Sequence, residues 1–203
     1  MEWLLRGLLL LAVGCGPAAG PGIDTERLEA HLRDGDLLFR RGIGAAGRTV
    51  AALDRAGLYS HTGIAVRSDS GWMVVHAVPS EPDFEGDIDR VKCEPVGRFY
   101  SEFRAAAGCI MRLRHDPDTA AASRAAREAL RLSRLRVPFD HDYAWNDTTR
   151  LYCTQLVAYV YSLASVDLVD GRRTRCTLPG LAGDYVFPSD VAQSPLLTLI
   201  YSF

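Results

Sequence analysis

The 203-residue sequence has little net charge and no long apolar run, and each absence excludes a class of protein. The formal charge of −2 at pH 7 is too small for a general attraction to nucleic acid, and no basic cluster interleaved with aromatic residues appears. The apolar run at residues 8–13 is too short to span a bilayer as a helix. We therefore expect no nucleic-acid partner and no membrane-spanning helix from this run.

Cysteine is scarce, and its spacing excludes a structural zinc site. None of the five cysteines lies in a CxxC pair or at zinc-knuckle spacing, so we expect no structural metal. In an oxidising compartment Cys93 and Cys109 could form one disulfide, which would leave Cys153 and Cys176 unpaired. The sequence alone does not fix this pairing.

The N-terminus is typical of an export signal. Residues 1–14 contain Arg6, an apolar stretch and small residues, and they predict a signal peptide. "LAVGC" resembles a bacterial lipobox, which implies cleavage before Cys15 and lipidation of its thiol. An ordinary signal peptide with an incidental cysteine is the alternative. Residues 15–23 then form a lipid-anchored linker, and we expect an exported lipoprotein of the bacterial cell envelope that faces the periplasm.

Residues 24–203 are long enough for one domain with a substantial core. The pattern mixes helices and strands without regular alternation, which favours the α+β class. Helices are expected at residues 24–32, 45–55, 118–136 and from 153 onward, with a weak one near 97–106. Strands are expected at residues 36–39, 61–67, 72–78, 109–114 and 196–203. The remaining residues, including most of 79–108 and 177–191, are expected to be irregular.

The predicted hairpin at residues 61–78 brings two histidines together. If its turn is Ser68–Gly71, paired residue numbers add to 139 across an antiparallel ladder. One face then carries Ile64, Val66, Met73 and Val75, and the other carries His61, Gly63, Ala65, Val74 and His76. His76 faces Gly63 and is a diagonal neighbour of His61, so one hydrogen bond can join the two imidazoles.

Cys153 begins an apolar helix, and we expect this N-terminus to lie in front of the small residues Gly63 and Ala65. A helix N-terminus and a nearby imidazolium both lower a cysteine pKa, so we expect a thiol that is largely ionised near neutral pH. His61 would act as the base and His76 would orient it. The backbone N–H of Cys153 is a natural oxyanion donor. The alternative for Cys153 is a buried core cysteine.

Several segments resemble one enzyme family. They are "DGDLLF" at 34–39, "YSHTGIAV" at 59–66, "VVHAV" at 74–78, "VPFDHDY" at 137–143, "LYCTQLV" at 151–157 and "FPSD" at 187–190. Together these resemble the permuted papain-like amidases of the NlpC/P60 superfamily, of the YaeF/YiiX type. The order of the histidine and cysteine segments along this chain is distinctive, because the ordinary papain-like chain places the cysteine before the histidine.

The resemblance implies a circularly permuted papain-like fold, in which an antiparallel sheet packs against the helix of the nucleophile. It also implies a hydrolytic Cys153, a base at His61 and a third polar residue at His76. Tyr152 and Gly63 are the expected substrate-binding residues. Many relatives carry glutamate at the third position, and a histidine there is more similar to the lecithin:retinol acyltransferase-like proteins.

These observations predict a cysteine hydrolase that cleaves a cell-wall peptide amide, or a related envelope amide, through a thioester. We expect it to be a monomer that needs no cofactor and is held to the membrane through Cys15. One alternative is a lipid acyltransferase or esterase with the same triad. The other is a catalytically silent lipoprotein that binds envelope material.

Three further patterns each have a plain structural alternative. Residues 140–142 (Asp-His-Asp) could suggest a metal site, although three adjacent side chains cannot all point inward. "GIGAAG" at 42–47 matches a dinucleotide fingerprint, but no acidic residue follows at the required distance. Arginines at 124, 127, 131 and 134 form a helix stripe that could meet anionic lipid, and a solvated face is the favoured reading.

Overall fold

The computed structural model describes residues 23–114 and 120–203, and it shows the expected α+β class. One sheet of six strands has the order β4-β3-β2-β1-β5-β8, with every neighbouring pair antiparallel. These strands are β1 (Leu37–Gly42), β2 (His61–Ser68), β3 (Gly71–Val78), β4 (Arg90–Pro95), β5 (Ala105–Leu113) and β8 (Leu197–Ser202). Two short strands, β6 (Thr174–Cys176) and β7 (Gly183–Tyr185), form a separate hairpin. The predicted signal peptide and Cys15 lie outside the described residues.

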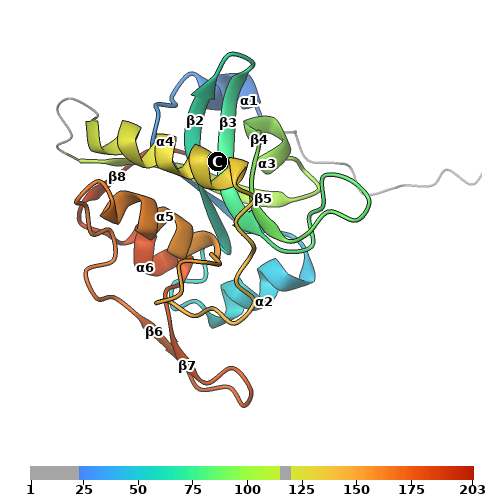
Figure 1. Ribbon diagram of the computed structural model, residues 1–203, viewed down its shortest axis with the longest axis vertical. Coiled ribbons are helices and arrows are strands. Elements are labelled where there is room, and N and C mark those ends of the chain that lie inside the picture. Colours follow the sequence, from blue (N-terminus) through green and yellow to red (C-terminus); the bar gives the residue numbers. More distant parts are fainter. Residues whose placement is uncertain (1–22, 115–119) are drawn as a thin grey trace, which may run out of the picture.

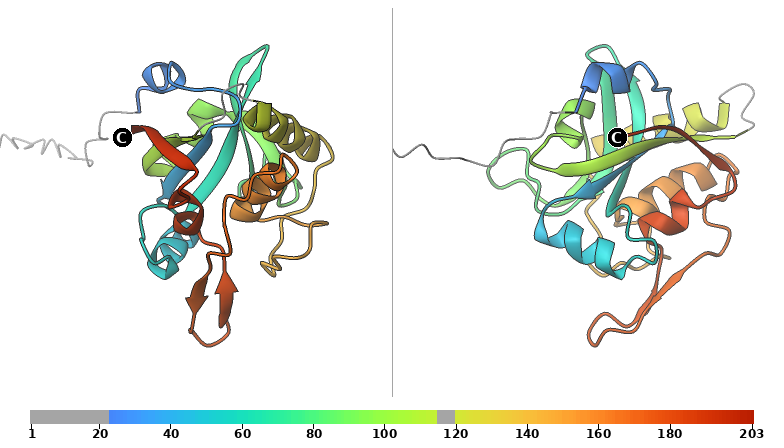
Figure 2. Two further views of the ribbon diagram at one scale, coloured as in Figure 1. Left: turned by 90° about the vertical axis from the view of Figure 1, so that its left-hand side faces the viewer. Right: turned by 180° about the vertical axis from the view of Figure 1, so that it is seen from behind.

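Helices cover both faces of the sheet (Figures 1 and 2). They are α1 (Thr25–Glu29), α2 (Ala45–Leu53), α3 (Val96–Phe99), α4 (Ala120–Arg134), α5 (Cys153–Ser162) and α6 (Pro188–Ala192). On one face α4 and α5 pack against Ile64, Val66 and Val75. On the other face α1 and α3 pack against Ala65 and Val74. The expected arrangement, in which the sheet packs against the helix that begins with Cys153, is therefore confirmed.

The long helix α4 lies close to the sheet because its buried side is made of alanine. Four alanines at helical spacing form this side: Ala122, Ala125, Ala126 and Ala129. Small side chains let a helix approach its neighbours closely, whereas the arginines of the same helix lie on its other sides. The composition of this helix thus determines which side is buried.

The register of the β2–β3 hairpin is the predicted one. Arg67 pairs with Trp72, Ile64 with Val75, and Ala65 with Val74. The ladder continues for one further pair, Ser68 with Gly71, so the connecting loop is two residues shorter than the turn that the sequence predicted. His61 and His76 consequently lie on the same face of the sheet, as expected.

Two segments that the sequence predicted to be irregular contain regular elements. Residues 79–108 include β4, α3 and the first part of β5, and residues 177–191 include β7 and most of α6. The sequence does not show β4 as a hydrophobic strand, because its buried residues include Lys92 and Glu94. Both of these side chains are buried together with residues of opposite charge. The weak helix expected near 97–106 is present only as the short α3, which ends at Phe99, and β5 begins at Ala105.

The expected position of the Cys153 helix relative to the histidine face is wrong. The face that carries Gly63 and Ala65 is covered by α3, whose Phe99 ring lies against both histidine rings. Helix α5 instead packs on the opposite face, where the large side chains of the hairpin lie. The physical reason is volume, because Phe99 and the imidazoles fill the space that the small residues leave.

The structure also excludes the disulfide between Cys93 and Cys109 that the sequence left possible. Cys93 lies in β4 and Cys109 in β5, and three strands separate these two strands in the sheet. Neighbouring strands are about 4.8 Å apart, so the two cysteines are far beyond disulfide reach. Cys93, Cys109, Cys153 and Cys176 are all free thiols.

The sheet topology also excludes the dinucleotide reading of "GIGAAG". A dinucleotide fingerprint requires a parallel βαβ unit, whereas β1 pairs only with antiparallel neighbours. Gly47 has a packing role instead, because a Cβ placed there would lie 2.9 Å from the carbonyl oxygen of Gly42. Among the described residues, no helix has the length and apolar character that crossing a membrane requires.

Candidate active site

Cys153 is the first residue of α5, and the surrounding contacts fix this helix end. Gln155 donates hydrogen bonds from Nε2 to three carbonyl oxygens of the preceding loop, those of Ala144, Trp145 and Asp147, at 2.9 to 3.2 Å. Thr154 donates its hydroxyl to the carbonyl oxygen of Val186 at 2.7 Å. The side chain of Tyr152, which precedes the helix, makes no capping hydrogen bond, whereas Oε1 of Gln155 accepts from the N–H of Tyr152 at 3.4 Å. The first backbone N–H groups of α5 therefore remain near the thiol.

The thiol of Cys153 lies against the backbone of Thr62, the residue that follows His61 in β2. Burial raises the pKa of Cys153 to about 11, although hydrogen bonding with the backbone of Thr62 and Thr154 and the charge of Arg40 lower it. These influences together oppose the expectation of a thiol that is ionised near neutral pH. Desolvation of the thiolate outweighs the helix N-terminus and the nearby cation.

His61 and His76 form a direct hydrogen bond between Nε2 of His61 and Nδ1 of His76, 2.8 Å apart. This contact confirms the geometry that the hairpin register predicted. On its other side, Nε2 of His76 lies 3.1 Å from Oε1 of Glu94 in β4. His61, His76 and Glu94 lie on three neighbouring strands and are all buried. They form an unbroken chain of polar contacts across the sheet.

Packing holds the two histidine rings in place. The Phe99 ring lies 5.7 Å from the His61 ring and 5.2 Å from the His76 ring, measured between centroids. Beneath them, a Cβ on Gly63 would lie 3.0 Å from the Cβ of His76. Gly63 is therefore a packing residue that makes room for His76. Gly63 itself is buried.

A cluster of charged side chains surrounds the buried Glu94. Nη1 of Arg104 lies 2.9 Å from both carboxylate oxygens of Glu94. Arg98 and Lys92 approach Oε2 at 3.3 and 3.6 Å. Arg104 also pairs with Glu81, which in turn binds Arg40 beside His61. The carboxylate of Glu94 is thus paired with cations as well as with His76.

Burial and these partners set the protonation states of the three residues. Burial lowers the pKa of His61 well below its ordinary value, and the charges of Arg40, His76 and Arg104 lower it further. Burial also lowers the pKa of His76, even though the hydrogen bond to Glu94 opposes this. Burial raises the pKa of Glu94, but its bond to His76 and its cationic neighbours bring it below its ordinary value. At neutral pH the histidines are neutral and Glu94 is ionised.

Tyr152, the other expected substrate-binding residue, is 3% exposed. Its ring contacts those of Tyr143 and Trp145, at centroid distances of 5.2 and 6.4 Å. Tyr143 is more exposed than Tyr152, and the charge of Cys153 is among the causes that raise its pKa after burial. Its backbone has a φ of 54°, a conformation that costs free energy for a tyrosine. Tyr143, rather than Tyr152, presents accessible aromatic surface beside the thiol.

The acidic motif at residues 140–142 does not form a metal site. Asp140 is buried and accepts hydrogen bonds from the amides of Asp142 and Ala144 at 3.0 and 2.5 Å. His141 pairs with Asp89, and Asp142 pairs with Arg150, so the three side chains diverge. In residues 23–114 and 120–203, no group of three or more metal-ligating side chains comes together.

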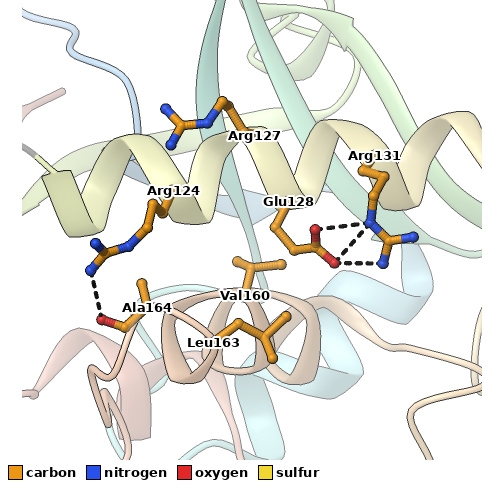
Figure 3. A pocket seen from close by; sticks show the side chains of 7 residues that line it. All are labelled: Arg124, Arg127, Glu128, Arg131, Val160, Leu163 and Ala164. Atoms are coloured by element: carbon orange, nitrogen blue, oxygen red, sulfur yellow. Dashed lines mark hydrogen bonds and ion pairs between the residues drawn. The ribbon is translucent and has the colours of Figure 1, made fainter.

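A separate pocket of about 370 Å³ lies between α4 and the C-terminal end of α5 (Figure 3). Its lining comprises Arg124, Arg127, Glu128, Arg131, Val160, Leu163 and Ala164. Arg131 pairs with Glu128 at 2.6 Å, and Arg124 donates to the carbonyl oxygen of Ala164 at 3.3 Å. The arginine stripe is therefore partly neutralised within the protein.

Sequence reasoning missed Glu94, the third member of the buried chain. A signal was present, because Val91 and Cys93 alternate with Lys92 and Glu94, as in a strand with one apolar face. A third strand beside the hairpin would have placed Lys92 and Glu94 on the histidine face, and the structure pairs His76 with Lys92 in this way.

The comparisons with known proteins agree with this fold. The family model of the permuted papain-like amidase enzymes, YaeF/YiiX, C92 family, matches residues 31–201. The crystal structure of the metalloprotein yiiX from Escherichia coli O157:H7 has the same fold, with a TM-score of 0.67 at 20% sequence identity, and the match covers 85% of this chain and 98% of that chain. No curated protein matches the chain. From the extent of the family match, the chain belongs to the YaeF/YiiX type of permuted papain-like amidases, the C92 family.

Proposed function

We propose that this amidase cleaves an amide of the cell envelope through a thioester on Cys153, with His61 as the base and His76 as the residue that orients it. One observation carries the proposal. The buried chain of His61, His76 and Glu94 ends at the start of β2, where the backbone of Thr62 contacts the thiol. A nucleophile, a base and an orienting group arranged in this order are the components of covalent acyl transfer.

The protonation states support a general-base mechanism. A neutral thiol and a neutral His61 mean that the proton moves from sulfur to the imidazole as sulfur attacks the carbonyl carbon. The developing oxyanion is stabilised by the backbone N–H of Cys153. The imidazolium then protonates the leaving amine as the carbon–nitrogen bond breaks. Water, deprotonated by His61, hydrolyses the thioester and restores the thiol.

The substrate that fits best is a cell-wall peptide or a related envelope amide. Membership of an amidase family favours an amide over an ester. The export signal predicted at residues 1–14 supports an envelope location, with Cys15 as the membrane anchor and a monomer facing the periplasm. The same triad could transfer a fatty acyl group, and the histidine at position 76 is the feature that favours this second function.

The acyl group trapped on Cys153 tests the proposal. We would incubate the protein with cell-envelope extract, quench it in acid and map the modified peptides by mass spectrometry. A peptide on Cys153 supports the amidase, whereas a fatty acyl group supports acyl transfer. Cys176→Ser is the matched control, since Cys176 is a buried free thiol outside the histidine chain. Modification of any other cysteine, or of none, contradicts the proposal.

The histidine pair gives an independent test. His61→Ala and His76→Ala should each lower kcat, and the double variant should lose far less than the product of the two single losses, because the residues act as one unit. If the two losses in kcat multiply in the double variant, His76 does not act by orienting His61.

A further inference from the structure

The contact between His76 and Glu94 determines where protons reside in the histidine chain. Glu94 is ionised, and a carboxylate only accepts hydrogen bonds. The carboxylate lies 3.1 Å from Nε2 of His76, where the lone pair of an unprotonated nitrogen would be repelled, so the charge contact places the proton on this nitrogen. Since His76 is neutral, its Nδ1 is an acceptor.

The same reasoning extends to His61. Nδ1 of His76 accepts across the 2.8 Å hydrogen bond, so Nε2 of His61 must donate and carry its proton. Neutral His61 then has an unprotonated Nδ1, which is the state a base needs. If His76 carried its proton on Nδ1 instead, Nε2 of His61 would have to accept that hydrogen bond. Neutral His61 would then carry its own proton on Nδ1 and could not use that nitrogen as a base.

The contacts of Glu94 hold its carboxylate in one orientation. Its Oε1 faces His76 and Arg104, whereas Oε2 faces Arg104, Arg98 and Lys92. Glu94 is 1% exposed, and the three cations beside it compensate its charge. Because Glu94 is buried, bulk water does not compete for its carboxylate oxygens.

We propose that Glu94 is a positioning residue that fixes the tautomers of His76 and, through it, of His61, so that Nδ1 of His61 is left unprotonated and able to accept a proton. The inference rests on the proposed function for its catalytic consequence. The tautomers themselves can be measured without any substrate.

The histidine nitrogens report the tautomers directly. In protein labelled with ¹⁵N-histidine, long-range ¹H–¹⁵N spectra at pH 7.5 should show both His61 and His76 protonated on Nε2 and unprotonated on Nδ1. A spectrum with His76 doubly protonated, or with His61 protonated on Nδ1, overturns the proposal. This test needs no variant, so it holds even if a substitution at Glu94 prevents folding.

Glu94→Gln should reverse both tautomers. Three cations face Oε2, so the amide oxygen should take that position and the NH₂ group should face His76. Nε2 of His76 then accepts, its Nδ1 donates, and His61 becomes protonated on Nδ1. We expect kcat to fall by about 10²-fold or more, the contribution of a general base.

Asp83→Asn is the matched control. Asp83 pairs with Lys92 and Arg98, as Glu94 does, but it contacts no histidine. It removes the same charge from the same cluster, and the tautomers should stay unchanged. Equal changes in both variants, or unchanged tautomers in Glu94→Gln, overturn the role of Glu94 and leave the proposed function standing. Failure of acyl trapping on Cys153 would instead contradict the proposed function alone.

Discussion

Gly63 and His76 face each other across the β2–β3 ladder so closely that any side chain at position 63 collides with its neighbours. A Cβ there would lie 2.5 Å from Cγ1 of Val74 and 3.0 Å from the Cβ of His76. Gly63→Ala should therefore shift His76 and weaken its bond to His61. We expect a loss of about 1–3 kcal/mol in the free energy of unfolding, together with a lower kcat.

Chemical denaturation and steady-state kinetics would measure both effects. Gly97→Ala is the control, because a Cβ there would meet Thr25 at an ordinary distance of 3.5 Å. Full activity in Gly63→Ala would show that the histidine pair tolerates displacement.

The raised pKa of Cys153 predicts slow alkylation at neutral pH. Because burial raises this pKa to about 11, the rate of reaction with iodoacetamide should keep increasing with pH well above 8.5. Peptide mapping after labelling would separate Cys153 from the other cysteines. Rapid labelling of Cys153 below pH 7 would show that a thiolate–imidazolium pair forms at rest.

The pH dependence of catalysis should follow His61. Because its pKa lies well below 6.5, the base stays neutral at neutral pH, and kcat/KM should fall only when acidification protonates it. If acylation limits the rate, turnover should also be slower in D₂O, since the proton of Cys153 moves in the transition state. Equal rates in H₂O and D₂O under that condition would point to a preformed thiolate.

Stability should decrease on acidification below about pH 6.5, the ordinary histidine value. The pKa values of His61 and His76 are lowered in the folded state, so the unfolded chain binds more protons in this range. Each such histidine contributes a slope of up to about 1.4 kcal/mol per pH unit. Urea denaturation at pH 7.5 and 5.5 would measure the change. The double variant His61→Asn, His76→Asn should show a smaller decrease, and an equal decrease would contradict buried neutral histidines.

The N-terminal signal predicts membrane attachment through Cys15. Cys15→Ala should convert a protein that requires detergent into a soluble one with an unchanged thermal midpoint, since the linker precedes the domain. Detergent partitioning and mass spectrometry of the mature N-terminus would check this. An unmodified N-terminus at another residue would contradict lipidation.

The sequence predicted the parts of the site that depend on local periodicity. The register that joins His61 to His76 follows from alternation along one hairpin, and the start of α5 at Cys153 follows from helical spacing. The face on which α5 packs depends on which long-range partner fills each space. Phe99 comes from a segment without a clear pattern, so its position over the histidines could not be predicted.

The protonation states could not be predicted from the sequence for a related reason. A helix N-terminus is visible in the sequence and favours a thiolate, whereas burial of Cys153 depends on the packing of several distant elements. Glu94 shows the same limit, because a charged residue is recognised as buried only when its partners Arg104 and Lys92 are known.

The meander of β2, β3 and β4 has a consequence for how the enzyme becomes active during folding. It contains His61, His76 and Glu94 in one continuous stretch, and such local pairings form early and quickly. Cys153 comes from a later segment that must dock through α5 and the loop held by Gln155. Until that docking occurs the chain carries an ordinary, solvent-exposed thiol. Export in an unfolded state would therefore keep the nucleophile apart from its base until the protein reaches its destination.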